Sequence, residues 1–218
     1  MSSNAVILAA GAFPRKPYPR LLLEQADPVI CCDSAAAAFL RYFRGERLPD
    51  AVVGDMDSIP AAVRERCRSR LVPITEQDDN DMTKALGYLL DHYGGLDTIT
   101  ILGATGKRED HTVGNLSLLM EYARTRGLDA FSTPSVRMVS DYGEAFALRD
   151  SCTLWVGEGR QISLFSPDNS LRIRSQGLRW PLDEVVWDNW WKATLNQSTA
   201  DAVTLTFSHP SIALVILG

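Results

Sequence analysis

The stretch TITILGATGKREDHTVGNLSLLMEYARTR, which runs from Thr98 to Arg126, decides the fold of this chain. It begins with a short apolar run, Thr98–Ala104, and ends with a helical pattern, Thr112–Arg126, whose apolar residues recur at spacings of three and four. A turn that begins at Gly103 and contains Gly106 joins them. A strand, a tight turn and an amphipathic helix form half of a βαβ unit, so this stretch predicts a parallel sheet with helices packed against it.

The same alternation continues toward the N-terminus. Apolar runs of four to seven residues, most of them bounded by Gly, Pro or Asp, predict the strands Ala5–Gly11, Val29–Asp33, Ala51–Asp55 and Leu71–Ile74. Helical patterns predict Ser34–Arg44, Pro60–Ser69 and Asp81–Tyr93. We therefore expect a Rossmann-like α/β domain over residues 1–135, with a parallel sheet covered on both faces.

The pattern changes after about residue 135. Short strand-like runs follow one another, separated by turn residues and without amphipathic helices between them. These runs are Val136–Ser140, Ala145–Leu148, Thr153–Val156, Gln161–Phe165, Leu171–Ser175, Ala202–Phe207 and Ile212–Leu217. They predict a smaller antiparallel β-sandwich over residues 136–218.

Composition excludes several classes of protein. The chain has 218 residues, 45% of them hydrophobic, and its 22 Lys and Arg against 27 Asp and Glu give a net charge of −5. An acidic chain of this kind is not expected to bind nucleic acid. The four cysteines form no CxxC pair, and we expect a reducing, cytoplasmic location. No signal peptide and no membrane span are expected, because the apolar runs are too short.

Carboxylates follow three consecutive predicted strands. Asp33 ends one strand, Asp55 and Asp57 follow the next, and Asp78 and Asp81 lie between the third strand and its helix. Since parallel strands bring their carboxyl ends to one edge, these groups are expected to lie close together. Gathered carboxylates repel one another, which favours a bound cation, and Mg²⁺ prefers such ligands together with substrate phosphates.

Each of these aspartates has a simpler interpretation on its own. Asp is common in turns and at helix N-caps, and Asp79 and Asn80 are expected to be caps. The pair Asp55 and Asp57, which follows a turn-permitting Gly54, is harder to explain in this way. Taken together with Asp33 and Asp81, the group favours metal binding.

The loop after Thr98–Ala104 has the character of an anion site. Its glycines allow close approach of a ligand to the backbone, the following helix presents its N-terminus, and basic side chains can hold phosphate oxygens. The candidate residues are Gly103, Thr105, Gly106, Lys107, Arg108, Asp110, His111 and Asn115. For Asp110 and His111, mutual contacts in a helix first turn are an alternative. A basic loop and an acidic cluster at one sheet edge suit a nucleoside triphosphate with Mg²⁺.

Two further sets of residues keep two interpretations each. Lys84 follows Asp81 by three positions, so it is either in a surface ion pair with Asp81 or in contact with a phosphate. All five tryptophans fall in the predicted second domain. Trp155 is expected in the core, whereas Trp180, Trp187, Trp190 and Trp191 are expected to stack on a heteroaromatic ring or a partner subunit, or to form a small core.

These motifs, in this order, resemble the thiamine pyrophosphokinase family over nearly the whole chain. Gly54–Ile59 resembles the family's G-D-x-D-S-I signature, and Gly103–Asn115 resembles its G-A-T-G-x-R-x-D-H-T-x-x-N. Cys32–Ala35, Asp78–Leu86 and Gly177–Leu182, with Asn196 beyond it, resemble three weaker elements. Leu195 stands where the family usually has Ser. The resemblance implies an α/β domain, a β-sandwich and a homodimer with a shared thiamine pocket.

The resemblance also implies roles for individual residues. Asp55, Asp57 and Asp81 match the metal-binding carboxylates and, with Arg108 and Asp110, the catalytic group. The ATP site would be formed by Arg108, His111 and Asn115, together with Asp33, Asp78, Lys84, Gly103, Thr105 and Gly106. Trp180 and Asn196 match elements expected to bind thiamine.

The activity implied is Mg²⁺-dependent transfer of pyrophosphate from ATP to thiamine, with release of AMP. The thiamine hydroxyl would attack the β-phosphorus, and Asp110 or Asp33 would accept its proton. Three alternatives stay open at this point. The acceptor is another hydroxymethyl heterocycle such as a pterin; the chain binds a nucleotide without catalysis; or Asp55 and Asp57 serve a metal-dependent phosphatase.

Overall fold

The protein is described by a computed structural model over residues 3–218, and it divides into two compact units. The first unit runs up to Leu118 and includes Thr133–Asp141. The second comprises Leu119–Ser132 and Tyr142–Gly218. This division differs from the boundary expected near residue 135, because the chain passes between the units three times.

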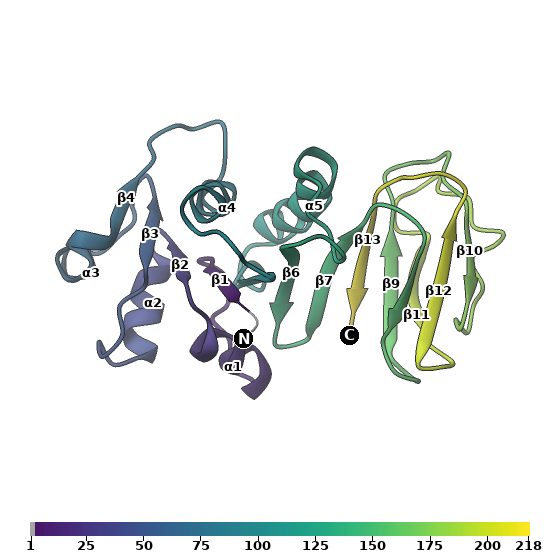
Figure 1. Cartoon of the computed structure of the whole chain (residues 1–218), viewed down its shortest axis with the longest axis horizontal. Helices are drawn as coiled ribbons and strands as arrows, with labels where there is room; N and C mark the ends of the chain where they lie inside the picture. The colour runs from purple at the N-terminus through teal and green to yellow at the C-terminus, as the bar shows by residue number, and fades with distance from the viewer. Residues whose placement is uncertain (1–2) are drawn as a thin grey trace. The chain divides into compact units, whose positions relative to one another are not determined.

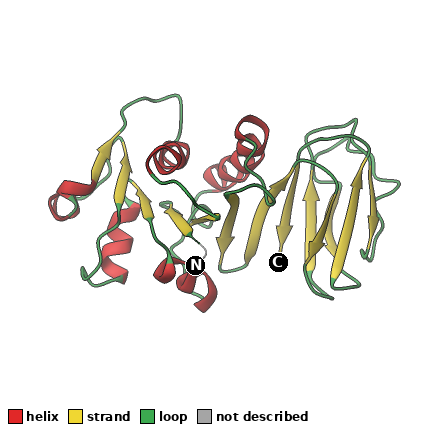
Figure 2. Cartoon of the chain, viewed as in Figure 1, coloured by secondary structure: helices red, strands yellow, loops and turns green. Residues whose placement is uncertain are grey.

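The first unit contains an arrangement of parallel strands (Figures 1 and 2). Its strands, in the order in which they pair, are β6 (Ser135–Ser140), β5 (Thr98–Leu102), β1 (Asn4–Leu8), β2 (Val29–Cys32), β3 (Ala51–Gly54) and β4 (Leu71–Pro73). Every neighbouring pair in this series is parallel. The predicted Rossmann-like sheet is thereby confirmed.

One strand lies on the other side of the expected division. We expected Val136–Ser140 to open the antiparallel domain, but β6 pairs in parallel with β5, with Ser135 opposite Thr98 and Val139 opposite Leu102. Its Val139 is buried in the same apolar cluster as Leu102. A short apolar run carries no signal for the direction in which it pairs, so the sequence alone did not reveal this strand's partner.

Helices cover both faces of the parallel strands (Figure 1). The helical segments are α1 (Pro17–Gln25), α2 (Ala35–Tyr42), α3 (Ala61–Arg66), the short 3₁₀ segment η1 (Arg68–Arg70), α4 (Asp81–His92) and α5 (Glu109–Arg126). Helices α1 and α2 pack on one face, where Val6 and Leu8 point, and α4 packs on the other. The predicted apolar stripe of α4 is buried, as expected.

The second unit is the predicted antiparallel sandwich. One layer is formed, in pairing order, by β11 (Ala193–Gln197), β9 (Gln161–Phe165), β13 (Ala213–Leu217) and β7 (Gly143–Leu148). The other is formed by β10 (Ile173–Gln176), β12 (Ala202–Phe207) and β8 (Cys152–Trp155). Side chains of both layers share one apolar core, which includes Leu164, Val203 and Val215.

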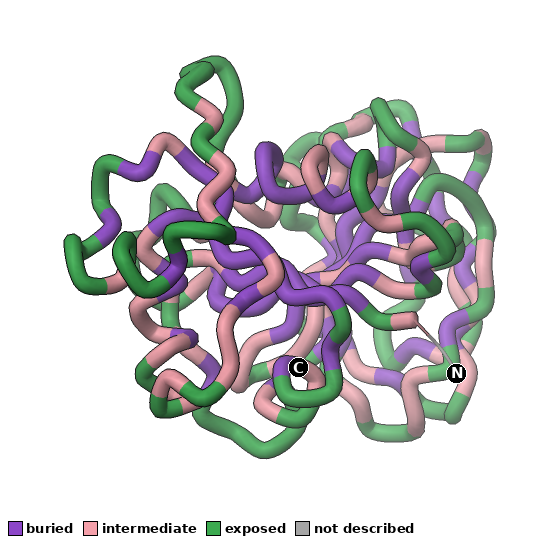
Figure 3. The backbone as a smooth tube through the Cα atoms, turned by 60° about the vertical axis from the view of Figure 1, so that its left-hand side comes forward, coloured by how far each residue is buried: buried purple, intermediate pink, exposed green. Residues whose placement is uncertain are grey.

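The tryptophans of this unit divide between core and surface. Trp187 is buried within the core, whereas Trp180, Trp190 and Trp191 are exposed. The expectation that Trp155 lies in the core is wrong, since 81% of its surface is exposed. Side chains alternate between the two faces of a strand, and in β8 the inward position is taken by Leu154. Buried backbone follows the strands, and exposed backbone follows their connections (Figure 3).

All four cysteines are free thiols in the structure, namely Cys31, Cys32, Cys67 and Cys152. Burial raises the pKa of the Cys31 and Cys32 thiols well above the ordinary range, so they stay protonated. Within residues 3–218, no helix combines the length and apolar character that crossing a bilayer requires.

Candidate active site

A cavity of about 400 Å³ opens at the carboxyl ends of the parallel strands. The chain proceeds from β1 outward to β4 and then returns to β5 on the other side of β1. Ligands of open α/β sheets bind where the strand order reverses in this way. The lining comes from the segments after β1, β3, β4 and β5, from the last residue of β2 and from the first turns of α4 and α5.

The segments after β1 and β5 are fastened to each other along one wall of this cavity. Ala9 N donates to Leu102 O at 2.8 Å, and Gly11 N donates to Gly103 O at 2.6 Å. A Cβ on Gly11 would lie 2.3 Å from Gly103 O, so only glycine fits there. We predicted that the strand runs over the whole of Ala5–Gly11, and did not foresee that its last residues form this wall. The small residues that follow the apolar run were the signal in the sequence.

Three of the predicted carboxylates come together at the ends of β2 and β3 and at the start of α4. A Cβ on Gly54 would lie 3.0 Å from Asp33 Cβ and 3.2 Å from Asp81 Oδ1, so both residues flank the same glycine. Burial raises the pKa of Asp81, the Asp33 and Asp55 charges raise it further, and Lys84 opposes them. We call Asp33, Asp55 and Asp81 the carboxylate cluster.

Asp33 is the buried member of the cluster. Only 5% of its surface is exposed, and its Oδ2 accepts a hydrogen bond from Ser58 Oγ. Its Oδ1 is buried and has no hydrogen-bond partner within residues 3–218. An ionised oxygen left unpaired in the interior is costly, so this atom is suited to face a cation.

Asp57 and Asp78 lie outside the cavity lining. Asp57 is exposed, and its backbone N–H donates to Asp55 Oδ1 at 3.0 Å. Asp78 is also exposed, and its N–H donates to Glu76 Oε1. No group of three or more Asp, Glu, His or Cys side chains in residues 3–218 is arranged to hold a metal ion. The assignment of Asp57 as a metal ligand and of Asp78 to the ATP site therefore stays a prediction.

The loop between β5 and α5 brings two cationic side chains, Lys107 and Arg108, to the same cavity, and the first turn of α5 brings His111. Lys107 Nζ donates to Ala10 O at 2.7 Å. Arg108 makes a two-point ion pair with Asp110, which holds the pKa of Asp110 at about 2. His111 N donates to Asp110 Oδ1 at 2.9 Å, so the first-turn contact considered for these two residues is present.

Two asparagines connect the helices on either side of the cavity. Asn80 caps α4, since its Oδ1 accepts a hydrogen bond from Thr83 N at 2.9 Å, as predicted for a cap. Asn80 Nδ2 donates to Asn115 Oδ1 at 3.2 Å, and Asn115 Nδ2 donates to Ala104 O at 2.7 Å. This chain of amides links α4, α5 and the end of β5.

Lys84 lines the cavity but is only 7% exposed, so a surface ion pair is excluded. The other predicted members of this site divide by type. Thr105 lines the cavity, whereas Gly103 and Gly106 shape its wall through their backbones, both with positive φ. Sequence reasoning did not place Gln77 or Thr112 in the lining, where the structure finds them.

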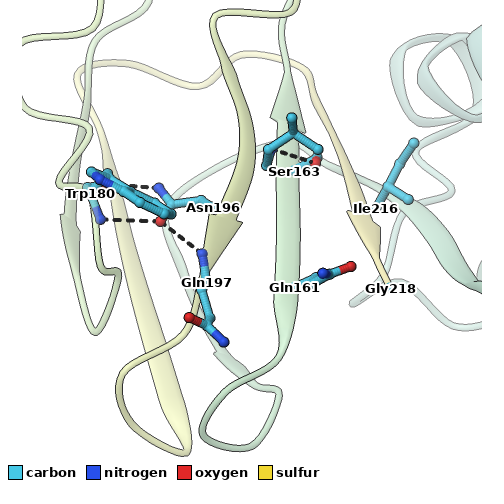
Figure 4. Close-up of a pocket in the computed structure, with 8 residues that line it drawn as sticks. Gln161, Ser163, Trp180, Asn196, Gln197, Ile216 and Gly218 are labelled. Atoms are coloured by element: carbon cyan, nitrogen blue, oxygen red, sulfur yellow. Dashed lines mark hydrogen bonds between the residues drawn. The ribbon is translucent and has the colours of Figure 1, made fainter.

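The second unit has a pocket of its own, of about 320 Å³, lined by Trp180, Leu195 and Asn196 among others (Figure 4). Asn196 Nδ2 donates to Trp180 O at 2.6 Å, and Asn196 Oδ1 accepts from Trp180 N at 3.2 Å. The buried amide thus fixes the backbone beneath an indole that is 54% exposed. The structure brings together the two residues predicted to bind thiamine, and it gives Asn196 a positioning contact.

Comparison with known families agrees with these motifs. The family model described as "Thiamin pyrophosphokinase, catalytic domain" matches residues 19–131, and the one described as "Thiamin pyrophosphokinase, substrate-binding domain" matches residues 143–212. The chain belongs to the thiamine pyrophosphokinase family. It is therefore an enzyme of the thiamine diphosphokinase type, which forms thiamine diphosphate by pyrophosphate transfer.

Individual members of the thiamine pyrophosphokinase family are distant relatives of this chain. A rice protein named thiamine pyrophosphokinase 1 is 28% identical over 213 residues, which cover 84% of this chain and 75% of the rice protein. The crystal structure of the Bacillus subtilis thiamine pyrophosphokinase superposes with a TM-score of 0.77 at 21% identity, over 99% of both chains. That of the yeast protein gives 0.81 at 14% identity, covering 100% of this chain and 87% of the yeast chain. The two structures show that the fold is shared.

Proposed function

We propose that this enzyme transfers pyrophosphate from ATP to the hydroxyl group of thiamine, uses Mg²⁺ and releases AMP. The observation that carries this proposal is that one cavity, of about 400 Å³, is lined both by carboxylates just after β3 and at the start of α4 and by cations of the loop after β5. A metal–triphosphate complex presents both charges, negative on its oxygens and positive on its metal.

The triphosphate is proposed to lie against the loop before α5. Arg108 offers a planar fork of donors, Lys107 a point charge, and the first turn of α5 its free N–H groups. Arg108 and Asp110 are both largely exposed, so their ion pair can open for an anion at little cost. Asn115, tied to Ala104 O, would hold the wall of the site in place.

We propose that the carboxylate cluster, which within residues 3–218 is not a complete metal site by itself, supplies part of the ligands of a magnesium ion. Asp33 Oδ1 is a buried acceptor without a partner in the described chain, and the space a Cβ would fill at Gly54 lies between Asp33 and Asp81. Mg²⁺ is commonly held by one or two carboxylates together with phosphate oxygens and water. We propose Asp55 and Asp81 as ligands, with Asp33 beside them, and keep Asp57 as the further ligand predicted from its motif. When bound, the ion would neutralise charge on the pyrophosphoryl oxygens.

The proton of the thiamine hydroxyl needs an acceptor within the site. We keep Asp110 and Asp33 as the two candidate acceptors. The contact with Arg108 lowers the pKa of Asp110 to about 2, so Asp110 would become a stronger base only when Arg108 turns to a phosphate. Asp33 is buried next to Asp81. With either acceptor, positioning together with electrostatic stabilisation would supply most of the catalysis.

Thiamine is proposed to bind at the pocket of the second unit. The exposed Trp180 indole offers a flat surface for its rings, and stacking against a cation is worth about 0.5–2 kcal/mol. The resemblance of the sequence to the family further supports a homodimer with a shared active site, which we include in the proposal. ATP and thiamine are the proposed substrates.

Phosphorus NMR of ATP, Mg²⁺ and thiamine with the purified enzyme tests this function. We expect the β and γ resonances of ATP to be replaced by those of thiamine diphosphate, with AMP formed in equal amount. Release of inorganic phosphate together with ADP, without AMP or thiamine diphosphate, would instead indicate a phosphatase. AMP release with a pterin alcohol but not with thiamine would change the acceptor. A bound ATP that stays intact with every acceptor would indicate a silent nucleotide-binding protein.

A further inference from the structure

Lys84 occupies an unusual position for a lysine. Among the basic residues of the described chain, it is the one that is buried, with 7% of its surface exposed. It lies in α4 one turn after Asp81, and its Nζ donates to Ile74 O at 3.2 Å. Burying an ammonium group is costly unless opposite charge or hydrogen bonds compensate, so its surroundings must supply that compensation.

Opposite charge is supplied near Lys84 by the carboxylate cluster. The charge of Lys84 acts on Asp81 in the opposite direction to those of Asp33 and Asp55. Lys84, Asp55 and Asp81 line the same cavity, and Asp33 lies against Asp81 across Gly54. One fixed positive charge thus faces the same cavity as two of the three carboxylates, and it acts on Asp81 one helical turn away.

Lys107 and Arg108, which are expected to meet phosphates, differ from Lys84 in burial and in position. They are exposed and belong to the loop before α5. Lys84 is held inside by its bond to Ile74 O, and Ile74 N in turn donates to Gly54 O at 2.8 Å. The ammonium group of Lys84 is therefore fixed to the segment after β4, which is itself bonded to Gly54 beside the cluster. It is not free to follow a substrate.

We propose that Lys84 is the resident counter-ion of the carboxylate cluster, which keeps Asp33, Asp55 and Asp81 together while no divalent cation is bound. The proposal rests on the proposed function in one respect, namely that the divalent cation is the Mg²⁺ of that reaction. Lys84 is then a positioning residue. Its positive charge stabilises the metal-free enzyme and at the same time competes with the incoming cation.

This role predicts two opposite effects of Lys84→Met, which keeps a long unbranched side chain and removes its charge. The variant should be less stable without metal, and it should bind Mg²⁺ more tightly. Without Mg²⁺, in EDTA at pH 8, we expect the midpoint of thermal unfolding to fall by at least about 5 °C. In a magnesium titration followed by the same unfolding signal, the half-saturating Mg²⁺ concentration should fall at least about threefold. Arg68→Met is the matched control, since it removes one positive charge from an exposed side chain outside the cavity.

A double variant keeps the test decisive if Lys84→Met fails to fold. Removing one negative charge should restore the balance, so Lys84→Met/Asp33→Asn is expected to fold and to recover most of the lost thermal stability in EDTA. A double variant no more stable than Lys84→Met would overturn the proposal. So would a single variant that unfolds like Arg68→Met and binds ATP more weakly, because Lys84 would then be a phosphate ligand.

The outcome can be separated from that of the proposed function. Formation of AMP from ATP and thiamine by the wild-type enzyme tests the function, whereas the stability comparison in EDTA needs neither substrate nor metal. A wild-type enzyme without thiamine-dependent AMP formation would remove the reaction and leave the stability result to decide on Lys84. An active wild-type enzyme whose Lys84→Met variant shows neither shift would remove the counter-ion and leave the reaction.

Discussion

The carboxylate cluster depends on backbone conformations that few residues adopt. Asp33 and Met56 both have positive φ, 38° and 69°, and Gly54, which lies against Asp33, has a φ of 155°. Met56 is also buried, and its carbonyl accepts a hydrogen bond from Arg64. Residues held in sparsely populated conformations persist only where the surroundings enforce them, and they gather at functional sites. Within the cluster, Asp33 is the residue that itself has such a conformation.

Asp33→Asn should separate the stability of the cluster from its activity. The change keeps the shape of the side chain and removes one of three mutually repelling charges. We expect the unfolding midpoint in EDTA to rise by about 2–4 °C and the stabilisation by added Mg²⁺ to shrink. Turnover should fall at least about 100-fold, measured as thiamine-dependent AMP formation. A variant that turns over like the wild type would remove Asp33 from the site.

Asp57→Asn should affect activity alone. Its side chain is exposed and outside the cavity lining, so its contribution to folding is small. If it joins the metal as its motif implies, turnover should drop at least about 100-fold while the unfolding midpoint in EDTA stays within about 1 °C of the wild type. Normal turnover at saturating Mg²⁺ would show that Asp57 serves only the turn with Asp55.

Residue types at strand ends predicted much of this site. The parts that were not predicted depend on which side chains are buried. Asp33, Asp55 and Asp81 were all expected at one edge, because parallel strands align their carboxyl ends. The spacing of Lys84 from Asp81 gave two open interpretations, and neither foresaw a buried ammonium group. Whether a side chain points inward depends on how its whole helix or strand packs, and a short stretch of sequence does not show this. For the same reason we predicted Trp155 in the core, whereas its strand turns it outward.

At the scale of elements, the cavity wall is a set of short backbone connections. The segments after β1 and β5 touch through hydrogen bonds from Ala9, Gly11 and Ala12, and α4 and α5 are joined through Asn80 and Asn115. Each connection fixes an element end rather than an element middle. The position of the site is therefore set by contacts that constrain few positions of the sequence, since each needs only a small residue or an amide at a single position.

Gly11→Ala should disrupt this wall. The added Cβ would lie 2.3 Å from Gly103 O and 2.6 Å from Thr105 O, so the two segments must separate. We expect a loss of about 1–3 kcal/mol in the free energy of unfolding and a fall of about 100-fold in kcat/KM for ATP. Gly87→Ala in α4 is the matched control.

The control has the opposite expected sign. A Cβ on Gly87 would meet nothing within 4 Å, and alanine in a helix interior is favoured over glycine by about 0.5–1 kcal/mol. Urea denaturation should therefore show Gly87→Ala to be more stable than the wild type, with unchanged kinetics. If Gly11→Ala behaved in the same way, the close approach of the β1 and β5 segments would not limit the site.

The elements that sequence patterns missed are those with weak or interrupted periodicity. Helix α1 has only nine residues and two prolines in its first turn, which is too short for a clear apolar stripe. Strand β11 is interrupted by a register shift around Leu195, whose φ of 59° breaks the alternation on which strand prediction depends. Long periodic segments such as α4 were predicted well, because many residues contribute to the same pattern.

At the scale of the whole molecule, the two units carry different chemistry. The first unit holds the charged groups suited to a metal–triphosphate complex, and the second holds an aromatic pocket with few charges. Neither unit by itself offers both sets of groups in one cavity of the described chain. The homodimer with a shared active site that we propose would bring the two proposed substrates together, and it makes a prediction that single-chain catalysis does not.

Mixing two inactive variants tests this arrangement. Asp55→Asn removes a carboxylate of the first unit, and Trp180→Ala removes the indole of the second, so each variant alone should form little AMP. When equal amounts are co-expressed, random pairing makes half of the dimers mixed, and each mixed dimer regains one intact site of two. Activity should then recover to about a quarter of that of the wild type. Sedimentation must show dimers, and a mixture no more active than its components would place each site within one subunit.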